Sequence, residues 1–445
     1  MLALDPVWLE ELSEFLRIPS VSADPTHRDD VRRAGEWVCE FVRRSGGECE
    51  LVVERGGRPL VIGEIRASRD ADAAATVLVY GHFDVQPPAP LEEWESPPFE
   101  PTIRGEWLYA RGIADDKGQL YLLLKAAMLL AAEGALPVNV RVACDGEEEV
   151  GGHSIVNWIA EDERGADACV IFDAHMPKRG QPAFYIATRG LCYFHVRVLA
   201  GVRDLHSGSY GGAALNGMHA LMQTLSAVLP RNGRLPDPLR QGLIPPTEEE
   251  LADWALQEPG EQVLAGQGAR PADPRAAEEF YLRTWGEPSL DVHGLAGGSP
   301  QLQKTVIPVT GEANLSIRLA PGQHPDVIGP VVERLLREAA PEGADVEIEL
   351  WSSAPPGLIP PDSAAIRLGQ DAFERAIGAR PLLLRAGGTL PVVPALADKG
   401  IPTIVSGFDL PEGNVHSPNE RFLVEHIPLG VAAARELFTS LAGLR

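Results

Sequence analysis

The chain has 445 residues, more than one hydrophobic core usually serves, so two domains are expected. Hydrophobic residues make up 44% and charged residues 23% of the chain, an ordinary globular composition that excludes fibrous and disordered proteins. The formal net charge of −24 repels nucleic-acid phosphates and anionic membranes, because both are bound chiefly through clusters of lysine and arginine. We therefore expect neither a nucleic acid nor a membrane as a partner.

Cysteine usage and the N-terminal residues bear on the compartment. The five cysteines are an odd number without CxxC spacing, which favours reduced thiols over a disulfide framework. Residues 1–16 carry acids where a secretory signal would need a basic stretch and a long apolar run. We expect no segment to approach the apolar length of a membrane span. Together these observations predict a cytoplasmic protein.

In chain order, helical patterns first alternate with short apolar runs. Asp5 and Pro6 are typical of an N-cap and a first helical residue, so the chain is predicted to open with an amphipathic helix. Further helices are predicted over residues 31–45 and 119–133. Strands are predicted at residues 76–80, 138–144, 168–172 and 402–406. Strands separated by helices indicate an α/β domain with a mostly parallel sheet.

A different pattern begins near residue 188 and ends near residue 355. Predicted elements there are strands at 191–199, 312–319 and 345–351 and helices at 214–229 and 325–339. Two strand–helix units of this kind suit a smaller α+β domain, with residues 230–290 as a long insertion rich in Pro, Gly and acids. The prolines of residues 354–361 mark a return linker. The predicted domains are therefore 1–187 with 356–445, and an inserted domain of 188–355.

Side chains of the types that can bind metals follow each of the four predicted strands. In strand order, these groups are His82 and Asp84, then Glu147, Glu148 and Glu149, then Asp173, and finally His416. Asp115 and Asp116 form a fifth cluster just before the helix at 119–133. Because open α/β sheets bind ligands at the carboxyl ends of their strands, these clusters are expected to converge on one site.

Imidazoles combined with carboxylates suit Zn²⁺, or Mn²⁺ or Co²⁺ at a higher coordination number. There are more such groups than one tetrahedral ion needs, which favours two ions about 3.5–4 Å apart that share a carboxylate. Each cluster alone has a simpler interpretation: a surface turn, a helix cap or a solvated face. The occurrence of five such clusters, all at strand ends or helix starts, favours a metal site over these simpler interpretations.

The motifs GHFDVQP, RGIADDKG, EEEVGG and NVHSPNE occur in this order. With them the chain resembles the two-zinc metallopeptidases that include carnosinases, cytosolic dipeptidases, aminoacylases and glutamate carboxypeptidases. DLHSGSYGG, KTVIP, SIRLAPG and RAGGTLP are most similar to the carnosinase-like dipeptidase branch. The resemblance covers nearly the whole chain. It implies a zinc-exopeptidase-type catalytic domain, an inserted lid and dimerisation domain, a homodimer, and two divalent ions per subunit.

The resemblance also implies roles for the clustered residues. His82 would bind one metal and His416 the other, Asp115 would bridge them, and Glu149 and Asp173 would complete the two shells. Asp84 would orient the His82 ring. Glu148 would be the general base, because the spacing to Gly151 matches the family's Glu-Glu-x-Gly pattern, and Glu147 falls where no acid is required.

Substrate contacts are implied for the later part of the chain. His206 would stabilise the oxyanion, from its own chain or from a second subunit, and Thr305 could be supplied in the same way. Arg318 would grip the substrate's C-terminal carboxylate, which Thr389 would also contact. From the residues alone, a capped turn is the favoured interpretation of His206, and a surface pair with Glu312 is the favoured interpretation of Arg318.

The expected activity is metal-dependent hydrolysis of the amide bond of a dipeptide or similar small peptide with a free C-terminal carboxylate. The alternative is an N-acyl amino acid deacylase or desuccinylase with the same metals, which would not require a free α-amine. A non-catalytic metal-binding scaffold is disfavoured because Glu148 and Asp115 are both present. Serine-hydrolase and nucleotide-binding functions are disfavoured because the GxSxG and GxGxxG motifs are absent.

Overall fold

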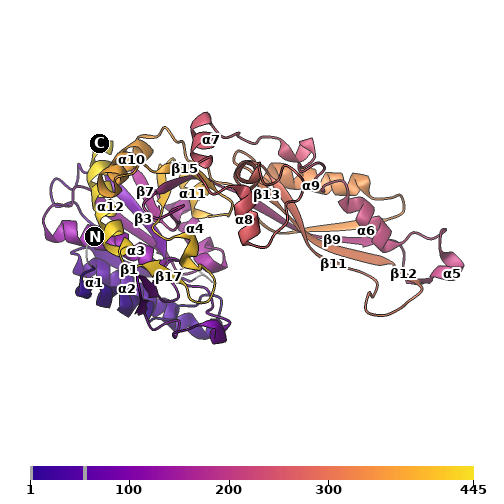
Figure 1. Ribbon diagram of the computed structural model, residues 1–445, viewed down its shortest axis with the longest axis horizontal. Coiled ribbons are helices and arrows are strands. Elements are labelled where there is room, and N and C mark those ends of the chain that lie inside the picture. Colours follow the sequence, from indigo (N-terminus) through magenta and orange to yellow (C-terminus); the bar gives the residue numbers. More distant parts are fainter. Residues whose placement is uncertain (1–3, 54–57) are drawn as a thin grey trace. The chain divides into compact units, whose positions relative to one another are not determined.

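The computed structural model describes residues 4–53 and 58–445. The chain divides into two compact units (Figure 1). Unit 1 comprises Met1–Ile186, Ile359–Leu384 and Pro391–Arg445, and unit 2 comprises Ala187–Leu358 and Arg385–Leu390. The short segment 385–390 thus belongs to unit 2, although the residues on either side of it belong to unit 1.

Unit 1 is built on a six-stranded sheet of the described residues, in the order β1-β2-β6-β3-β7-β16. The strands are β1 (Glu48–Val53), β2 (Pro59–Ile65), β3 (Thr76–His82), β6 (Asn139–Asp145), β7 (Ala168–Phe172) and β16 (Thr403–Ser406). The four strands from β6 to β16 are parallel, and β2 runs antiparallel to both of its neighbours, β6 and the edge strand β1. The predicted α/β class with a mostly parallel sheet is confirmed.

Helices cover both faces of this sheet, since β6, β7 and β16 are buried along their whole length. The helices are α1 (Pro6–Leu16), α2 (Arg28–Arg44), α3 (Lys117–Ala132), α4 (His153–Glu161), α10 (Ala364–Ile377), α11 (Val392–Asp398) and α12 (His426–Leu441). Helix α3 contacts β3 and β7, whereas α4 and α11 contact each other and strands β6 and β16.

The remaining strands of unit 1 form two smaller sheets. One sheet pairs β17 (Arg421–Leu423) with β5 (Trp107–Tyr109), and β5 with β4 (Thr102–Arg104). The other pairs β15 (Leu382–Ala386) with β8 (Ala183–Thr188), whose last residues lie in unit 2.

The opening helix begins as the sequence predicts. The Asp5 carboxylate accepts a hydrogen bond from the Val7 N–H at 2.8 Å, and Pro6 occupies the first helical position. The C-terminal end of α1 is tied to the start of α3, because the buried Lys117 ammonium donates to the carbonyls of Phe15 (3.2 Å) and Ile18 (2.6 Å). This contact fixes the helix that directly follows Asp115 and Asp116.

Residues 426–444 are long and apolar enough to cross a membrane by length and composition. The expectation that no segment reaches that length is therefore wrong here. Helix α12, which makes up most of this stretch, packs against α3 and α10 and buries Leu437, Phe438 and Leu441. These contacts make it a core helix of unit 1.

Unit 2 contains an antiparallel four-stranded sheet, in the order β11-β13-β9-β14. Its strands are β9 (Gly190–Leu199), β11 (Ser289–Ala296), β13 (Thr310–Leu319) and β14 (Asp345–Ala354). Burial alternates along β9, and its inner side chains, including Phe194 and Val196, pack with residues of α6 (Gly217–Leu225) and α9 (Pro325–Ala339). This sheet is separate from the sheet of unit 1, as expected for an α+β domain.

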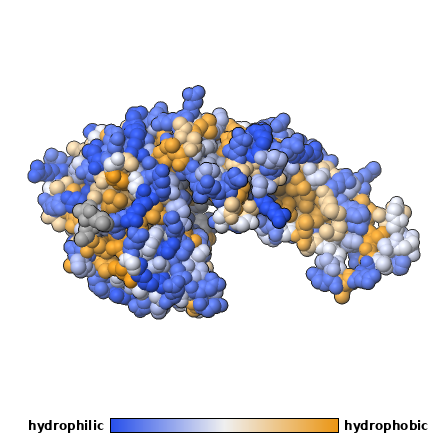
Figure 2. Space-filling model, viewed as in Figure 1, coloured by the Kyte–Doolittle hydropathy of each residue, from blue (hydrophilic) through white to orange (hydrophobic). Residues whose placement is uncertain are grey.

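Residues 230–290 contain more regular structure than the sequence pattern indicates. They include α7 (Glu248–Trp254) and α8 (Gly260–Gly266), and their end forms the start of β11. A buried ion pair connects α7 with segment 385–390, because the Arg385 Nε lies 2.5 Å from Glu250 Oε1. Hydrophilic side chains cover most of the visible surface (Figure 2), in keeping with the many charged residues.

Candidate metal centre

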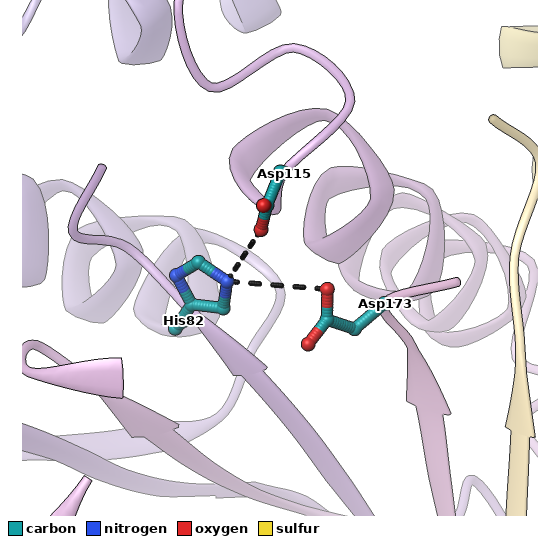
Figure 3. Close-up of side chains that lie close together, drawn as sticks. All are labelled: His82, Asp115 and Asp173. Carbon is teal, nitrogen blue, oxygen red and sulfur yellow. Dashed lines mark hydrogen bonds and ion pairs between the residues drawn. The ribbon is translucent and has the colours of Figure 1, made fainter. Parts of the chain in front are cut away.

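The carboxyl ends of the parallel strands bring the first group of ligands together. His82 is the last residue of β3, and Asp173 directly follows β7. The His82 Nε2 lies 2.9 Å from Asp115 Oδ1 and 4.0 Å from Asp173 Oδ1 (Figure 3). The ring is fully buried, and Asp115 and Asp173 are nearly so. One ligand atom from each of the three side chains lies within 4.8 Å of the other two, which is close enough to hold one cation.

A second group shares Asp115 with the first. The His416 Nε2 lies 2.8 Å from Asp115 Oδ2 and 3.2 Å from Glu149 Oε2. Asp115 thus presents one oxygen to each imidazole, the arrangement needed for a carboxylate that bridges two ions. The Glu149 Oε1 is buried and has no hydrogen-bond partner among the described residues, so it is free to bind a cation.

The electrostatics of the cluster also fit cations. Burial raises the pKa of Asp173 well above its usual range, and the charge of Asp115 adds to this effect. The pKa of His416 is raised to about 10 by hydrogen bonds to Asp115 and Glu149. Both effects reflect an excess of carboxylates in a buried site, which divalent ions would balance while leaving the imidazoles neutral.

Asp84 connects two loops of the centre. Its two carboxylate oxygens accept hydrogen bonds from the backbone N–H groups of Glu148 and Glu149, each at 3.2 Å. The His82 Nδ1 lies 3.1 Å from the Asp84 carbonyl and 3.4 Å from its carboxylate. These contacts hold the ring with Nε2 toward Asp115, and Asp84 itself is fully buried.

Glu148 belongs to neither ligand group. Burial raises its pKa to about 7, and the neighbouring charges of Glu149 and Asp115 contribute to the shift. A carboxyl group with such a pKa accepts and returns a proton readily near neutral pH. Glu148 is therefore suited to act as a general acid and base beside the two ligand groups.

Two of the clustered acidic residues, Glu147 and Asp116, stabilise the local structure. The Glu147 carboxylate accepts from the Ser154 N–H (2.7 Å) in the first turn of α4 and from the Arg58 N–H (2.9 Å). Asp116 Oδ2 accepts from the His82 N–H at 3.1 Å, and a Cβ at Gly81 would lie 2.6 Å from that oxygen. Neither residue occurs in a ligand group.

Sequence reasoning missed Glu420, which holds the loop that carries Asp115. Its carboxylate accepts hydrogen bonds from the backbone N–H groups of Gly112, Ala114 and Asp115 at 2.8–3.1 Å, and from the Arg111 guanidinium at 2.7 Å. Glu420 is fully buried. The signal was available, because Glu420 is the final residue of the motif NVHSPNE.

Gln86, in the motif GHFDVQP, was also missed. Its amide donates to Glu149 Oε2 at 2.8 Å. This contact orients the Glu149 carboxylate in the same way that Asp84 orients the His82 ring.

In unit 2, the structure brings His206 and Thr305 together. His206 lies on β10 (Leu205–His206), which pairs with β12 (Val306–Ile307), and Thr305 directly precedes β12. Both side chains are exposed. The His206 Nδ1 accepts from the Gly208 N–H at 3.0 Å, at the start of the short helix α5 (Ser207–Tyr210). His206 therefore caps a turn, and its Nε2 has no partner among the described residues.

Arg318 and Thr389 also lie together in unit 2, with Arg318 Nη1 3.1 Å from Thr389 Oγ1. The alternative pairing of Arg318 with Glu312 is wrong. Both residues lie on β13, six positions apart, which is about 20 Å at the rise of an extended strand. Glu312 instead pairs with Arg197 on the neighbouring strand at 3.3 Å.

The sequence matches the model of Peptidase family M20/M25/M40 over residues 78–440. The chain belongs to this family. It is therefore a metallopeptidase, the kind of enzyme predicted from the motifs. Membership implies divalent metal ions, and the two ligand groups are the candidates to hold them.

Curated M20 relatives match almost the whole chain. The Cys-Gly metallodipeptidase dug1 of Schizosaccharomyces pombe is 29% identical, over 95% of this chain and 93% of the relative. The Beta-Ala-His dipeptidase of Homo sapiens is 27% identical, over 93% of this chain and 86% of the relative. The resemblance to dipeptidases of this family is confirmed.

Solved M20 structures share the fold. The metallo-carboxypeptidase Sso-CP2 of Sulfolobus solfataricus has a TM-score of 0.84 at 26% identity, over 99% of this chain and all of that one. Human carnosine dipeptidase 1 has a TM-score of 0.75 at 25% identity, over 98% and 96% of the two chains. The chain is thus a metallo-dipeptidase-like hydrolase.

Proposed function

We propose that this M20 enzyme is a dipeptidase that acts on dipeptides or similar small peptides with a free C-terminal carboxylate. The observation that carries the proposal is the position of Asp115, whose two oxygens lie 2.9 Å and 2.8 Å from the imidazoles of His82 and His416. The dipeptidase activity named for two relatives supports the substrate class.

In this proposal His82 and Asp173 hold one divalent ion, Glu149 and His416 hold the other, and Asp115 bridges them. Zn²⁺ suits the mixed nitrogen and oxygen ligands best, with Mn²⁺ or Co²⁺ as alternatives. When bound, the pair of ions lowers the pKa of a water and polarises the scissile carbonyl.

The protein's own side chains do the proton transfer and the positioning. Glu148 takes a proton from the attacking water and delivers it to the leaving amine, a role that suits a carboxyl group with a pKa of about 7. His206 donates from Nε2 to the developing oxyanion, from its own chain or from the partner in a homodimer formed through unit 2. Arg318 and Thr389 bind the C-terminal carboxylate, and Thr305 contributes beside His206.

The experiment that tests the proposal is a substrate comparison on protein purified without chelator. Dipeptides are assayed beside N-acetyl and N-succinyl amino acids that carry the same C-terminal residue. We expect hydrolysis of the dipeptides and much slower release from the acylated compounds. Hydrolysis of the acylated compounds without dipeptide turnover would assign the enzyme to the deacylase or desuccinylase group instead.

A further inference from the structure

Two guanidinium groups of unit 2 lie close together without an acidic partner. Arg189, between β8 and β9, is only 9% exposed, and Arg318 lies near the end of β13. Among residues 4–53 and 58–445, neither forms an ion pair, although the chain has 63 acidic residues for 39 basic ones. Burial and the neighbouring charge of Arg318 together lower the pKa of Arg189 to about 10, and the charge of Asp291 partly opposes them.

Arg189 holds the loop 387–389 through its backbone and its side chain. Its backbone N–H donates to the Gly388 carbonyl at 2.9 Å, and its Nε donates to the Gly387 carbonyl at 3.1 Å. Its Nη1 donates to Ser289 Oγ at 3.0 Å, which connects the loop with β11. Arg189 therefore fixes the position of the residue that follows, Thr389.

The Thr389 hydroxyl then orients Arg318. Its single proton goes to the Arg189 carbonyl at 2.7 Å, so the same oxygen can only accept from Arg318 Nη1, at 3.1 Å. One edge of the Arg318 guanidinium is thereby fixed, while Nε and Nη2 have no hydrogen-bond partner among the described residues. A planar fork held in this way is ready to bind a carboxylate through two parallel hydrogen bonds.

We propose that Arg189 is a positioning residue for a carboxylate site at Arg318, and that its buried charge strengthens the attraction of this site for the C-terminal carboxylate of the substrate. The inference rests on the proposed dipeptidase function and adds a residue to it. Arg189 holds Thr389 and Arg318 in place and adds a second positive charge, while its Nε and Nη1 donate to Gly387 and Ser289 rather than to the substrate.

The test compares Arg189→Met and Arg189→Lys with the wild type, on a dipeptide and on the same dipeptide as its C-terminal amide. For Arg189→Met we expect KM for the dipeptide to rise about tenfold or more with kcat within about threefold, the size expected for a lost charge-assisted contact. The amide lacks the anion, so its kcat/KM should be unchanged. Arg189→Lys keeps the positive charge but cannot reproduce the hydrogen bonds of the planar guanidinium, so its KM for the dipeptide should lie between those of the wild type and Arg189→Met.

Arg197→Met is the matched control. Arg197 lies on β9, the strand that Arg189 directly precedes, but it pairs with Glu312 and Glu347 toward the far end of that strand, so its removal should leave both substrates unaffected. An equal loss of kcat/KM for dipeptide and amide would show a purely structural role for Arg189 and overturn the inference. So would an unchanged KM in Arg189→Met.

Two further outcomes separate the proposals. If Arg189→Met does not fold, the test passes to Arg189→Lys, where a KM for the dipeptide equal to that of the wild type overturns the inference. If the wild type hydrolyses no dipeptide, the proposed function itself fails and the inference falls with it. If the wild type is active and only the Arg189 variants behave unexpectedly, the dipeptidase assignment stands.

Discussion

Glu420 Oε1 accepts a hydrogen bond of 3.1 Å from the backbone N–H of Asp115, a residue 305 positions earlier in the chain. The same carboxylate bonds the buried Arg111 guanidinium. The position of the candidate bridging ligand therefore depends on a carboxylate that binds no metal itself.

Glu420→Gln should weaken metal binding by about 10–100-fold, the usual effect of losing a group that orients a ligand. An amide has only one accepting oxygen, so one side of the loop loses its partner in either orientation. The variant also leaves the buried charge of Arg111 unpaired, which should lower the free energy of unfolding by about 3–5 kcal/mol. Metal titration and denaturant unfolding measure the two effects. Glu412→Gln, an exposed neighbour, is the control, and equal metal affinity in both variants would exclude the role of Glu420.

Glu148→Gln should keep its metal content and lose about 10²–10⁴ of kcat, because the amide cannot take the proton from water. Metal analysis and steady-state kinetics on the same preparation check this. Glu147→Gln is a matched comparison, because the Glu147 carboxylate caps the start of α4. It should lower the free energy of unfolding by about 1 kcal/mol, and kcat should stay close to that of the wild type. A fully active Glu148→Gln enzyme would leave the reaction without its proposed base.

His206→Ala should lower kcat by about 10²–10³, the usual effect of losing one oxyanion donor. His219→Ala, which removes another exposed histidine of unit 2, should have no such effect. Mixing inactive His206→Ala with inactive Glu148→Gln distinguishes the source of the histidine. Activity returns in mixed dimers if His206 acts on the partner's site, and stays absent if it acts within its own chain. A His206→Ala enzyme with the wild-type kcat would rule out the oxyanion role.

Asp409 should make the metal-free protein less stable as the pH rises. Burial raises the pKa of its carboxyl group from 3.8 to about 8, and nearby acids such as Glu420 add to the shift. Between about pH 4 and pH 8 the folded state therefore keeps a proton that the unfolded state has lost, so stability falls as the pH rises through this range. At 1.36 kcal/mol per pH unit, the effect is at most roughly 6 kcal/mol.

Asp409→Asn should remove this dependence and leave the variant more stable than the wild type at pH 8. Denaturant unfolding at pH 5 and pH 8 after treatment with a chelator measures the difference. Asp398→Asn, an exposed substitution in the same unit, should keep the wild-type slope. Identical slopes for Asp409→Asn and the wild type would contradict the argument.

The strand positions and the candidate ligands were predictable because both depend on local pattern. The expected strand at 76–80 lies within β3, and the helix expected at 325–339 has the bounds of α9. Ligands at the ends of parallel strands converge through the geometry of the sheet alone. This is why His82 and Asp173 could be associated although 90 residues separate them.

Contacts between distant residues were not predictable. The three consecutive glutamates have different partners, and that of Glu147 became apparent only once Ser154 and Arg58 were in place. The ion pair of Arg385 with Glu250 joins residues 135 positions apart. It connects the 230–290 insertion, whose sequence shows no clear helix or strand pattern, with the segment 385–390. Arg189 carried no signal, because its role depends on the position of loop 387–389.

The central claim is that Asp115 bridges two divalent ions, and the metal content of wild type and Asp115→Asn tests it most directly. Both proteins are loaded with Zn²⁺, freed of excess metal, and measured by elemental analysis beside a circular dichroism spectrum. We predict two ions per chain in the wild type and fewer than one in the variant, with both proteins folded. A wild type that holds at most one ion, or an Asp115→Asn protein that still holds two, would contradict the account.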